Sequence, residues 1–144
     1  MATLAGAAYE AYARHQDERR FHPQGLLVDV GGYRLNILCA GNFAPGTPTV
    51  ILESGLGGPV IGWRFVRPEI AKFARVCSYY RAGYGWSDPG PMPRTALQIA
   101  KELHLLLQNA HIDPPYIPVG YSFGGYAVRV FNGLYPRKLP GPFW

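Results

Sequence analysis

One serine lies in a setting that could make it a nucleophile. Ser122 has glycine two positions before it and two positions after it, at Gly120 and Gly124, between an apolar run and a stretch of helical pattern. A serine hydroxyl attacks a carbonyl only when a base removes its proton and the side chain is held exposed. A sharp strand-to-helix turn does the holding, and glycines let the two backbones approach. The pattern predicts an elbow that presents Ser122 for covalent catalysis.

Attack on a carbonyl produces an oxyanion, which is stabilised by two backbone N–H donors. One donor would be the amide of Phe123, the residue after the serine, at the positive end of the following helix. A glycine-rich loop, 54–58, directly follows another short apolar run. We assign the second donor to the amide of Leu56 in this loop, and a plain glycine-rich turn is the alternative.

A general base for Ser122 is not evident in the sequence. The residues that follow Ser122 include no Asp, Glu or His. The four histidines all precede it, and we interpret each as a surface or helix-end residue: His15, His22, His104 and His111. The acid and the histidine of a catalytic triad are therefore expected to be absent from this chain.

The elements that would position these groups alternate along the chain. Two runs, 25–30 and 33–39, surround a Gly-Gly pair and predict a β-hairpin. Three strands and three helices are then expected to alternate, the strands at 49–53, 75–80 and 116–119 and the helices at 63–74, 95–110 and 122–134. This order predicts the α/β class, with a hairpin followed by a mostly parallel sheet and right-handed crossovers.

Local signals refine three of these elements. The run 49–53 is continuously apolar, which is typical of a strand covered on both faces. Thr95 followed by Gln98 predicts a capping box at the start of the 95–110 helix. In the 63–74 segment, four apolar residues have helical spacing and are expected to share one buried face: Trp63, Val66, Ile70 and Phe73.

Three segments together resemble the α/β-hydrolase family: the loop 54–58 (SGLGG), the stretch 80–88 (YRAGYGWSD) and the elbow 120–125 (GYSFGG). The resemblance runs from the hairpin at residue 25 to the helix that ends near 135. It implies that Arg81 and Asp88 brace the loop after the fourth strand. The sequence departs from the family pattern at three positions, with Tyr80 in place of Asp and with Ser54 and Tyr121 in place of His.

The resemblance also implies an incomplete domain. The family continues with further strands, a lid, an acid and a late histidine, so this chain resembles the N-terminal part of the fold, truncated after the nucleophile helix. Residues 1–24 are expected to form an N-terminal helix, at 3–20, and a linker. Residues 25–144 are expected to form the incomplete α/β-hydrolase domain.

Two functions remain open at this point. The first is a serine hydrolase that acts on a small-molecule ester, amide or related bond without a cofactor or a metal. The second is a non-catalytic, hydrolase-like chain that serves as a binding or assembly module. Because the 116–119 strand would have a bare edge, self-association through the sheet is also expected.

Composition excludes other partners. The net charge of +5 is modest, and the cluster Arg14, Arg19 and Arg20 is not the dense basic stripe of a nucleic-acid surface. The alanine-rich start is too short for a membrane span. As written, the chain is expected to be cytoplasmic, or exported or anchored if a segment precedes it.

The two cysteines, Cys39 and Cys77, each lie in a predicted strand. The preferred interpretation is two buried thiols that act as small apolar groups. The alternative is a cross-strand disulfide, which would indicate an exported protein. Neither a CxxC motif nor a Cys/His cluster supports a metal site.

Overall fold

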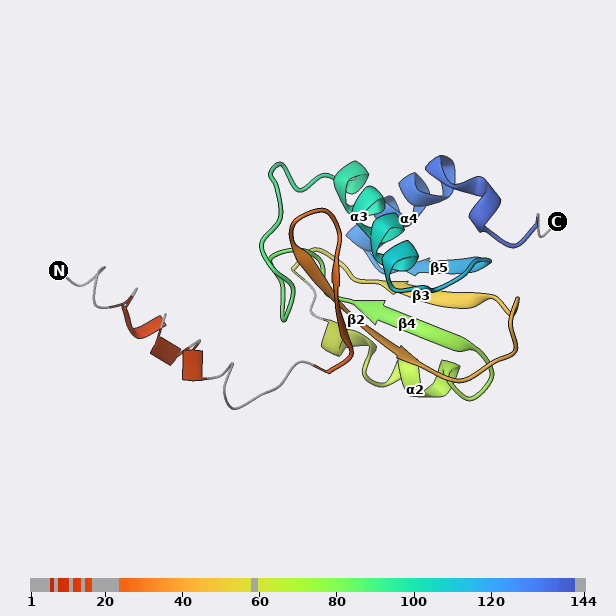
Figure 1. The fold of residues 1–144 in the computed structure, drawn as a ribbon, viewed down its shortest axis with the longest axis horizontal. Helices are drawn as coiled ribbons and strands as arrows, with labels where there is room; N and C mark the ends of the chain where they lie inside the picture. Colours follow the sequence, from red (N-terminus) through yellow and green to blue (C-terminus); the bar gives the residue numbers. More distant parts are fainter. Residues whose placement is uncertain are drawn as a thin grey trace.

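A mixed five-stranded sheet forms the centre of the computed structural model, which describes residues 6, 8–10, 12–13, 15–16, 24–57 and 60–141 (Figure 1). The strands are β1 (Leu26–Asp29), β2 (Arg34–Ala40), β3 (Thr49–Glu53), β4 (Arg75–Tyr79) and β5 (Tyr116–Gly120). The helices are η1 (Val60–Trp63), α2 (Val66–Ile70), α3 (Ala96–Asn109), α4 (Phe123–Leu134) and η2 (Pro136–Lys138). The strand order is β1-β2-β4-β3-β5.

The expected hairpin and the expected parallel strands are both present. β1 pairs antiparallel with β2, and β2 pairs antiparallel with β4, whereas β4, β3 and β5 are parallel. Asp29 turns the hairpin, since its Oδ1 accepts a hydrogen bond from the Gly31 amide at 2.9 Å. Gly31 and Gly32 both have positive φ, 109° and 98°, which an L side chain rarely adopts. The glycine pair therefore permits the tight return of the chain.

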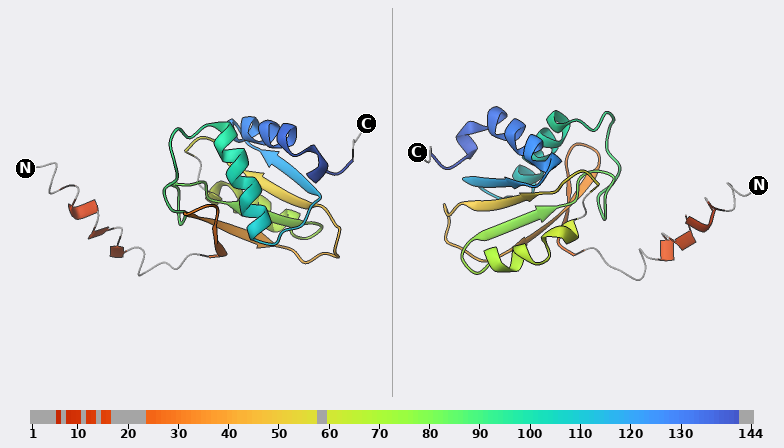
Figure 2. Two further views of the ribbon diagram at one scale, coloured as in Figure 1. Left: turned by 45° about the horizontal axis from the view of Figure 1, so that its top comes forward. Right: turned by 180° about the vertical axis from the view of Figure 1, so that it is seen from behind.

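Helices cover the two faces of the sheet unequally (Figures 1 and 2): α3 and α4 lie on one face and α2 on the other. β3 is buried throughout, and its side chains alternate between the faces. Ile51 belongs to the large core under α3 and α4, whereas Val50 and Leu52 join Val76 in a small core on the α2 side. The prediction of a strand covered on both faces is confirmed.

Helix α3 begins as its sequence predicts. Thr95 is the N-cap, and its side chain accepts a hydrogen bond from the Gln98 amide at 3.1 Å. The buried face of α3 carries the expected apolar residues: Ile99, Leu103, Leu106 and Leu107. Capping and apolar periodicity thus act together at this helix.

The prediction of one helix over 63–74 is wrong. The segment forms η1 and the five-residue α2, and then turns at 71–74 before β4. Phe73 is 71% exposed and Val66 is exposed as well, whereas Trp63 and Ile70 pack against the small core. The physical reason is the size of that core, because three buried strand residues offer too little apolar surface for a long helix.

The prediction of two free thiols is also wrong. Cys39 and Cys77 are directly opposite each other on β2 and β4, their Cα atoms are 4.1 Å apart, and their sulfurs form a disulfide. Cys77 is fully buried, whereas Cys39 is exposed. The pairing depends on the register of β2 on β4, which sequence patterns do not provide.

The structure describes only some of the residues for which the N-terminal predictions were made. Those residues within 3–20 that the structure describes are helical, and the others lie outside the described residues. Outside them, too, lie His22, Arg14, Arg19 and Arg20. Across the described ranges, no helix has the length and apolar character needed to cross a membrane. The same ranges contain no group of three or more His, Cys, Asp or Glu residues that could hold a metal ion.

Candidate active site

Ser122 occupies a strained turn between β5 and α4. Its backbone angles are φ 52° and ψ −123°, outside both the strand and the helix regions, and its side chain is exposed. Among the described residues other than glycine, only Ser122 and His111 have positive φ. Such a conformation costs free energy and persists only where the surroundings impose it, as they do at many functional sites. The chain therefore lifts this one hydroxyl out of the sheet at the N-terminus of α4.

Gly120 and Gly124 allow the turn because each lies against backbone. A Cβ atom added at Gly120 would be 2.5 Å from the carbonyl carbon of Gly124. A Cβ atom at Gly124 would be 2.5 Å from the carbonyl oxygen of Glu53 and 2.6 Å from that of Ser54. Real Cβ atoms do not approach backbone so closely, so the elbow tolerates only glycine at both positions without a shift.

The loop after β3 lies directly beside the elbow. The Tyr121 amide donates to the Glu53 carbonyl at 3.1 Å. A Cβ atom at Gly55 would be 3.2 Å from the Tyr121 ring and 3.4 Å from the Cβ atom of Ser122. The structure thus brings together the two segments that the sequence analysis assigns to the oxyanion donors. The Leu56 side chain is 75% exposed beside this contact.

At the start of α4 some backbone amides donate hydrogen bonds to backbone carbonyls and one does not. The Gly124 amide donates to the Tyr121 carbonyl and the Gly125 amide to the Ser122 carbonyl, each at 2.9 Å. Phe123 is the first residue of the helix, and its amide has no backbone partner among the described residues. A free amide at a helix N-terminus is suited to a developing negative charge.

Arg81 is buried behind the loop, where it joins three backbone and side-chain partners. Its Nε donates to Glu53 Oε1 at 2.7 Å, and its Nη1 donates to the Gly55 carbonyl at 3.1 Å. Its Nη2 donates to the Ser54 carbonyl. Arg81 belongs to the loop after β4, so these bonds link that loop to the end of β3 and to the loop that follows β3.

Glu53 and Tyr79 were missed by the sequence analysis. Tyr79 donates its hydroxyl proton to Glu53 Oε2, and both side chains are buried. Burial raises the pKa of Glu53, whereas the Arg81 charge and the hydrogen bonds from Tyr79 and Arg81 oppose that shift. Burial and the neighbouring carboxylate raise the pKa of Tyr79. A lone Glu at the end of an apolar strand was the available signal, since such a charge needs a buried partner.

Asp88 braces the loop between β4 and α3 against the hairpin. Its Oδ2 accepts from both the backbone amide and the Nε of Arg34, each at 2.9 Å. Its carbonyl accepts from the Gly83 amide at 2.9 Å. Hydrogen bonds from Arg34 lower the pKa of Asp88. These contacts fit a structural role for Asp88 and not that of a triad acid.

The described histidines make no hydrogen bond to the elbow. His104 stacks on Tyr135 with ring centroids 3.9 Å apart, at the C-terminal end of α4, whereas Ser122 lies at its N-terminus. Burial, with Lys138 nearby, lowers the pKa of His104. His111 follows the end of α3. Within the described part of the chain, no histidine makes a hydrogen bond to Ser122, so none of them is placed to act as its general base.

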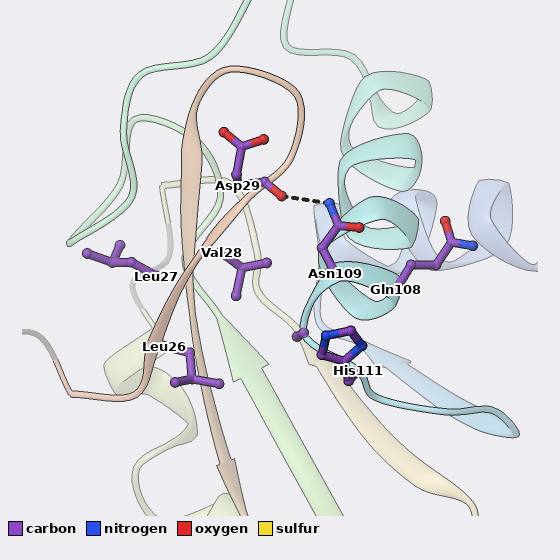
Figure 3. A pocket seen from close by; sticks show the side chains of 8 residues that line it. Leu26, Leu27, Val28, Asp29, Gln108, Asn109 and His111 are labelled. Carbon is purple, nitrogen blue, oxygen red and sulfur yellow. Dashed lines mark hydrogen bonds between the residues drawn. The ribbon is translucent and has the colours of Figure 1, made fainter.

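Exposed apolar and aromatic side chains surround the elbow, and an open pocket lies elsewhere on the described part of the chain. Leu56, Tyr84, Tyr121 and Tyr126 are all exposed. An open pocket of about 600 Å³ lies between β1 and the C-terminal end of α3, where Asn109 donates to the Asp29 carbonyl at 2.8 Å (Figure 3). β1 and β5 are at opposite edges of the sheet, so this pocket is not part of the elbow.

Comparison with known proteins places this arrangement in context. No protein-family model matches the chain. A protein named "Probable transporter efuK" from Hormonema carpetanum is 33% identical over 126 residues, which are 85% of this chain and 18% of that protein. An "AB hydrolase superfamily protein" from Gibberella zeae is 34% identical over 116 residues, 80% of this chain and 34% of that protein. The chain thus spans about a third or less of the length of these curated relatives.

A solved structure gives the same answer for the fold. The enol-lactonase from Burkholderia xenovorans LB400 superposes with a TM-score of 0.72 at 22% identity, over 79% of this chain and 44% of that one. Helices on both faces of a mixed sheet, with a strand-to-helix elbow at the parallel strand β5, agree with that superposition. On this agreement and the match to the fungal relative, the chain belongs to the α/β-hydrolase family.

Proposed function

We propose that this chain carries the nucleophile of a serine hydrolase that cleaves an ester, amide or related bond in a small molecule. Ser122 is the nucleophile, and the amides of Phe123 and Leu56 are the oxyanion donors. The observation that carries the proposal is the backbone of Ser122, held at positive φ by glycines in contact with backbone on both sides. A turn of this kind presents a serine in the family to which the chain belongs.

The chemistry requires three events at this turn. The Ser122 Oγ forms a bond to the carbonyl carbon of the substrate while a base takes its proton. The carbonyl electron pair moves onto oxygen, which the Phe123 and Leu56 amides stabilise. The leaving group then departs with the proton from the base, and water releases the acyl group from Ser122. The positive end of α4 favours the negative charge of the second event.

The base and the acid are proposed to come from residues beyond the described ones. No described histidine contacts Ser122, and in this family the acid and the histidine follow the serine along the chain. The relatives extend well beyond the matched segment, since the match covers 34% of the fungal hydrolase-family protein. We therefore infer that this chain is part of a longer enzyme, and that coding sequence downstream of codon 144 supplies the Asp and the His.

A fluorophosphonate probe tests the nucleophile. We expect the full-length protein to be labelled rapidly, and Ser122→Ala to abolish that labelling. The matched control is Ser87→Ala, which removes a hydroxyl that only bridges backbone at Asn36 and Tyr80. The 144-residue chain alone is expected to label feebly and to leave p-nitrophenyl esters intact. Labelling that survives Ser122→Ala, or a full-length protein that never labels, would contradict the proposal.

The same exposed edge that could receive further strands supports the second candidate, a non-catalytic binding or assembly module. Strand β5 ends the sheet, with Ile117 37% exposed and Val119 39% exposed. This candidate predicts a chain that folds alone, melts cooperatively and binds a partner through β5 without labelling at Ser122. Sedimentation and thermal melting of the 144-residue chain, beside the labelling experiment, separate the two functions.

A further inference from the structure

We propose that Arg81 is a positioning residue for the oxyanion hole, and that it acts by orienting and polarising the peptide unit between Gly55 and Leu56. The inference rests on the proposed function for what the Leu56 amide is used for. The orientation of that amide, however, is a property of the chain that can be measured without any reaction.

The geometry begins with three donors on one buried guanidinium. Arg81 Nε binds the Glu53 carboxylate, and the two terminal nitrogens bind the carbonyls of Ser54 and Gly55. The Arg81 and Glu53 side chains are 7% and 1% exposed. A guanidinium is planar, so fixing one nitrogen on Glu53 fixes the directions of the other two. The loop carbonyls are therefore held by a rigid fork and not by a flexible contact.

The consequence for Leu56 follows from the planarity of the peptide bond. The Gly55 carbonyl and the Leu56 N–H belong to one peptide unit, and this bond is not among the cis bonds of the described residues. In a trans peptide the C=O and N–H point in opposite directions. Because Arg81 holds the Gly55 oxygen on its own side, the Leu56 N–H must point away from Arg81.

The elbow lies beside that peptide unit. Gly55 is in contact range of Ser122, since a Cβ atom at Gly55 would be 3.4 Å from the Ser122 Cβ atom. Hydrogen bonds in series also polarise one another, so a cationic donor on the Gly55 carbonyl makes the Leu56 N–H a stronger donor. The buried charge is thereby transmitted to the site through one peptide group.

Arg81 also contacts the second half of the proposed hole. Its Cζ atom lies 5.4 Å from the centroid of the Phe123 ring, within the range of a cation–π contact. Phe123 supplies the other proposed donor amide. One guanidinium therefore contacts both segments, the loop after β3 and the start of α4.

A spectroscopic test follows the Leu56 amide directly. With ¹⁵N-leucine labelling of the full-length protein, Arg81→Lys should move the Leu56 ¹⁵N resonance upfield, because its peptide carbonyl loses a charged donor. Tyr79→Phe, which keeps the ring and releases only the hydroxyl on Glu53, should move it in the same direction by less. The matched control is Arg94→Lys, since Arg94 pairs with the buried Glu102 and, among the described residues, makes no hydrogen bond to the loop after β3.

The control separates positioning from general loosening. A Leu56 resonance that is unchanged in both Arg81→Lys and Tyr79→Phe, or that moves equally in Arg94→Lys, would overturn the inference. If Arg81→Lys does not fold, the Tyr79→Phe spectrum decides alone.

Probe kinetics then separate this inference from the proposed function. In the full-length protein, Arg81→Lys should lower the maximal rate of Ser122 labelling roughly tenfold, less than the 10²–10³ lost with a whole oxyanion donor, while apparent probe affinity is unchanged. Loss of affinity with an unchanged maximal rate would contradict positioning. If the Leu56 resonance moves but Ser122 never labels, the proposed function fails and the role of Arg81 in orienting the peptide stands.

Discussion

Two buried carboxylates in this protein have the same kinds of partner and different tasks. Glu53 and Glu102 each accept hydrogen bonds from one arginine and one tyrosine, and Glu102 accepts another from Gln98. Arg94 directs both terminal nitrogens at Glu102, each at 2.5 Å, in a closed pair. Arg81 contacts Glu53 with Nε and Nη2, and its terminal nitrogens also donate to loop carbonyls. The Arg94–Glu102 network ties elements of the fold together, and the Arg81–Glu53 network holds a loop beside Ser122.

The pKa values of the two carboxyl groups also shift in opposite directions. Burial raises the pKa of Glu53, and its hydrogen bonds do not reverse that shift. Burial acts on Glu102 in the same direction, but hydrogen bonds from Arg94, Tyr33 and Gln98 outweigh it and lower the pKa of Glu102. The difference teaches that burial prevails over the hydrogen bonds at Glu53, whereas the hydrogen bonds prevail over burial at Glu102.

Removal of each carboxylate should give the largest effects. Glu53→Ala leaves the Arg81 charge buried without its carboxylate and should cost about 3–5 kcal/mol of unfolding free energy. Glu102→Ala should cost less, because the Arg94 side chain is 22% exposed and can be hydrated, against 7% for Arg81. Urea unfolding of both variants measures the difference. Equal losses would mean that exposure of the arginine does not distinguish the two networks.

The backbone beside Glu53 gives the next effect. Gly124→Ala places a Cβ atom against the Glu53 and Ser54 carbonyls and should cost about 1–3 kcal/mol as overpacking. Gly125→Ala meets nothing within 4 Å and should be neutral or stabilising, since alanine is the better helix former. Thermal melting of this adjacent pair tests the elbow without touching a charge. A harmless Gly124→Ala would show that α4 can move off β3.

Acid titration of stability should distinguish the two carboxylates by sign. The lowered pKa of Glu102 means that its contribution is complete above the ordinary value of 4.5 and is lost as pH falls through the folded value. The raised pKa of Glu53 means that its contribution is present below 4.5 and is lost as pH rises through the folded value. Unfolding free energy measured from pH 3 to 7 should therefore rise less steeply in Glu102→Gln and more steeply in Glu53→Gln.

A change at the exposed edge strand β5 should have the smallest effect. This strand is the neighbour of β3, which contains Glu53. β5 pairs with β3, and Glu53 lies opposite Gly120. The exposed Val119 offers an apolar surface to a second chain, whereas Pro118 has no backbone N–H to donate to one. Val119→Lys should reduce concentration-dependent association of the 144-residue chain in sedimentation, and Leu97→Lys, on exposed α3, should not. A monomer at every concentration would remove the edge as an interface.

Sequence patterns predicted the parts of this fold that depend on neighbouring residues. The hairpin around Gly31, the buried strand at 49–53 and the Thr95 cap each depend on local spacing, and each is present. The helix at 63–74 failed because its length depends on how much sheet surface lies beneath it.

The candidate site divides in the same way. The turn at Ser122 follows from the glycines around it, whereas the partners of Arg81 follow from the order of strands. Glu53 and Arg81 are brought together by the pairing of β3 with β4, and no local pattern could have identified that contact. The Cys39–Cys77 pair depends likewise on strand register.

That pair has a consequence for the loop beside the elbow. The bond from Cys39 to Cys77 turns the intervening chain into a covalent ring, and the ring contains β3, Gly55, Leu56 and α2. The elbow and Arg81 lie outside it. A protease that nicks the exposed stretch near Gly46 would open the ring without releasing a piece. The proposed donor loop would stay joined to the elbow through the backbone, and the part of the chain before the cut would stay attached through the disulfide until a reductant released it.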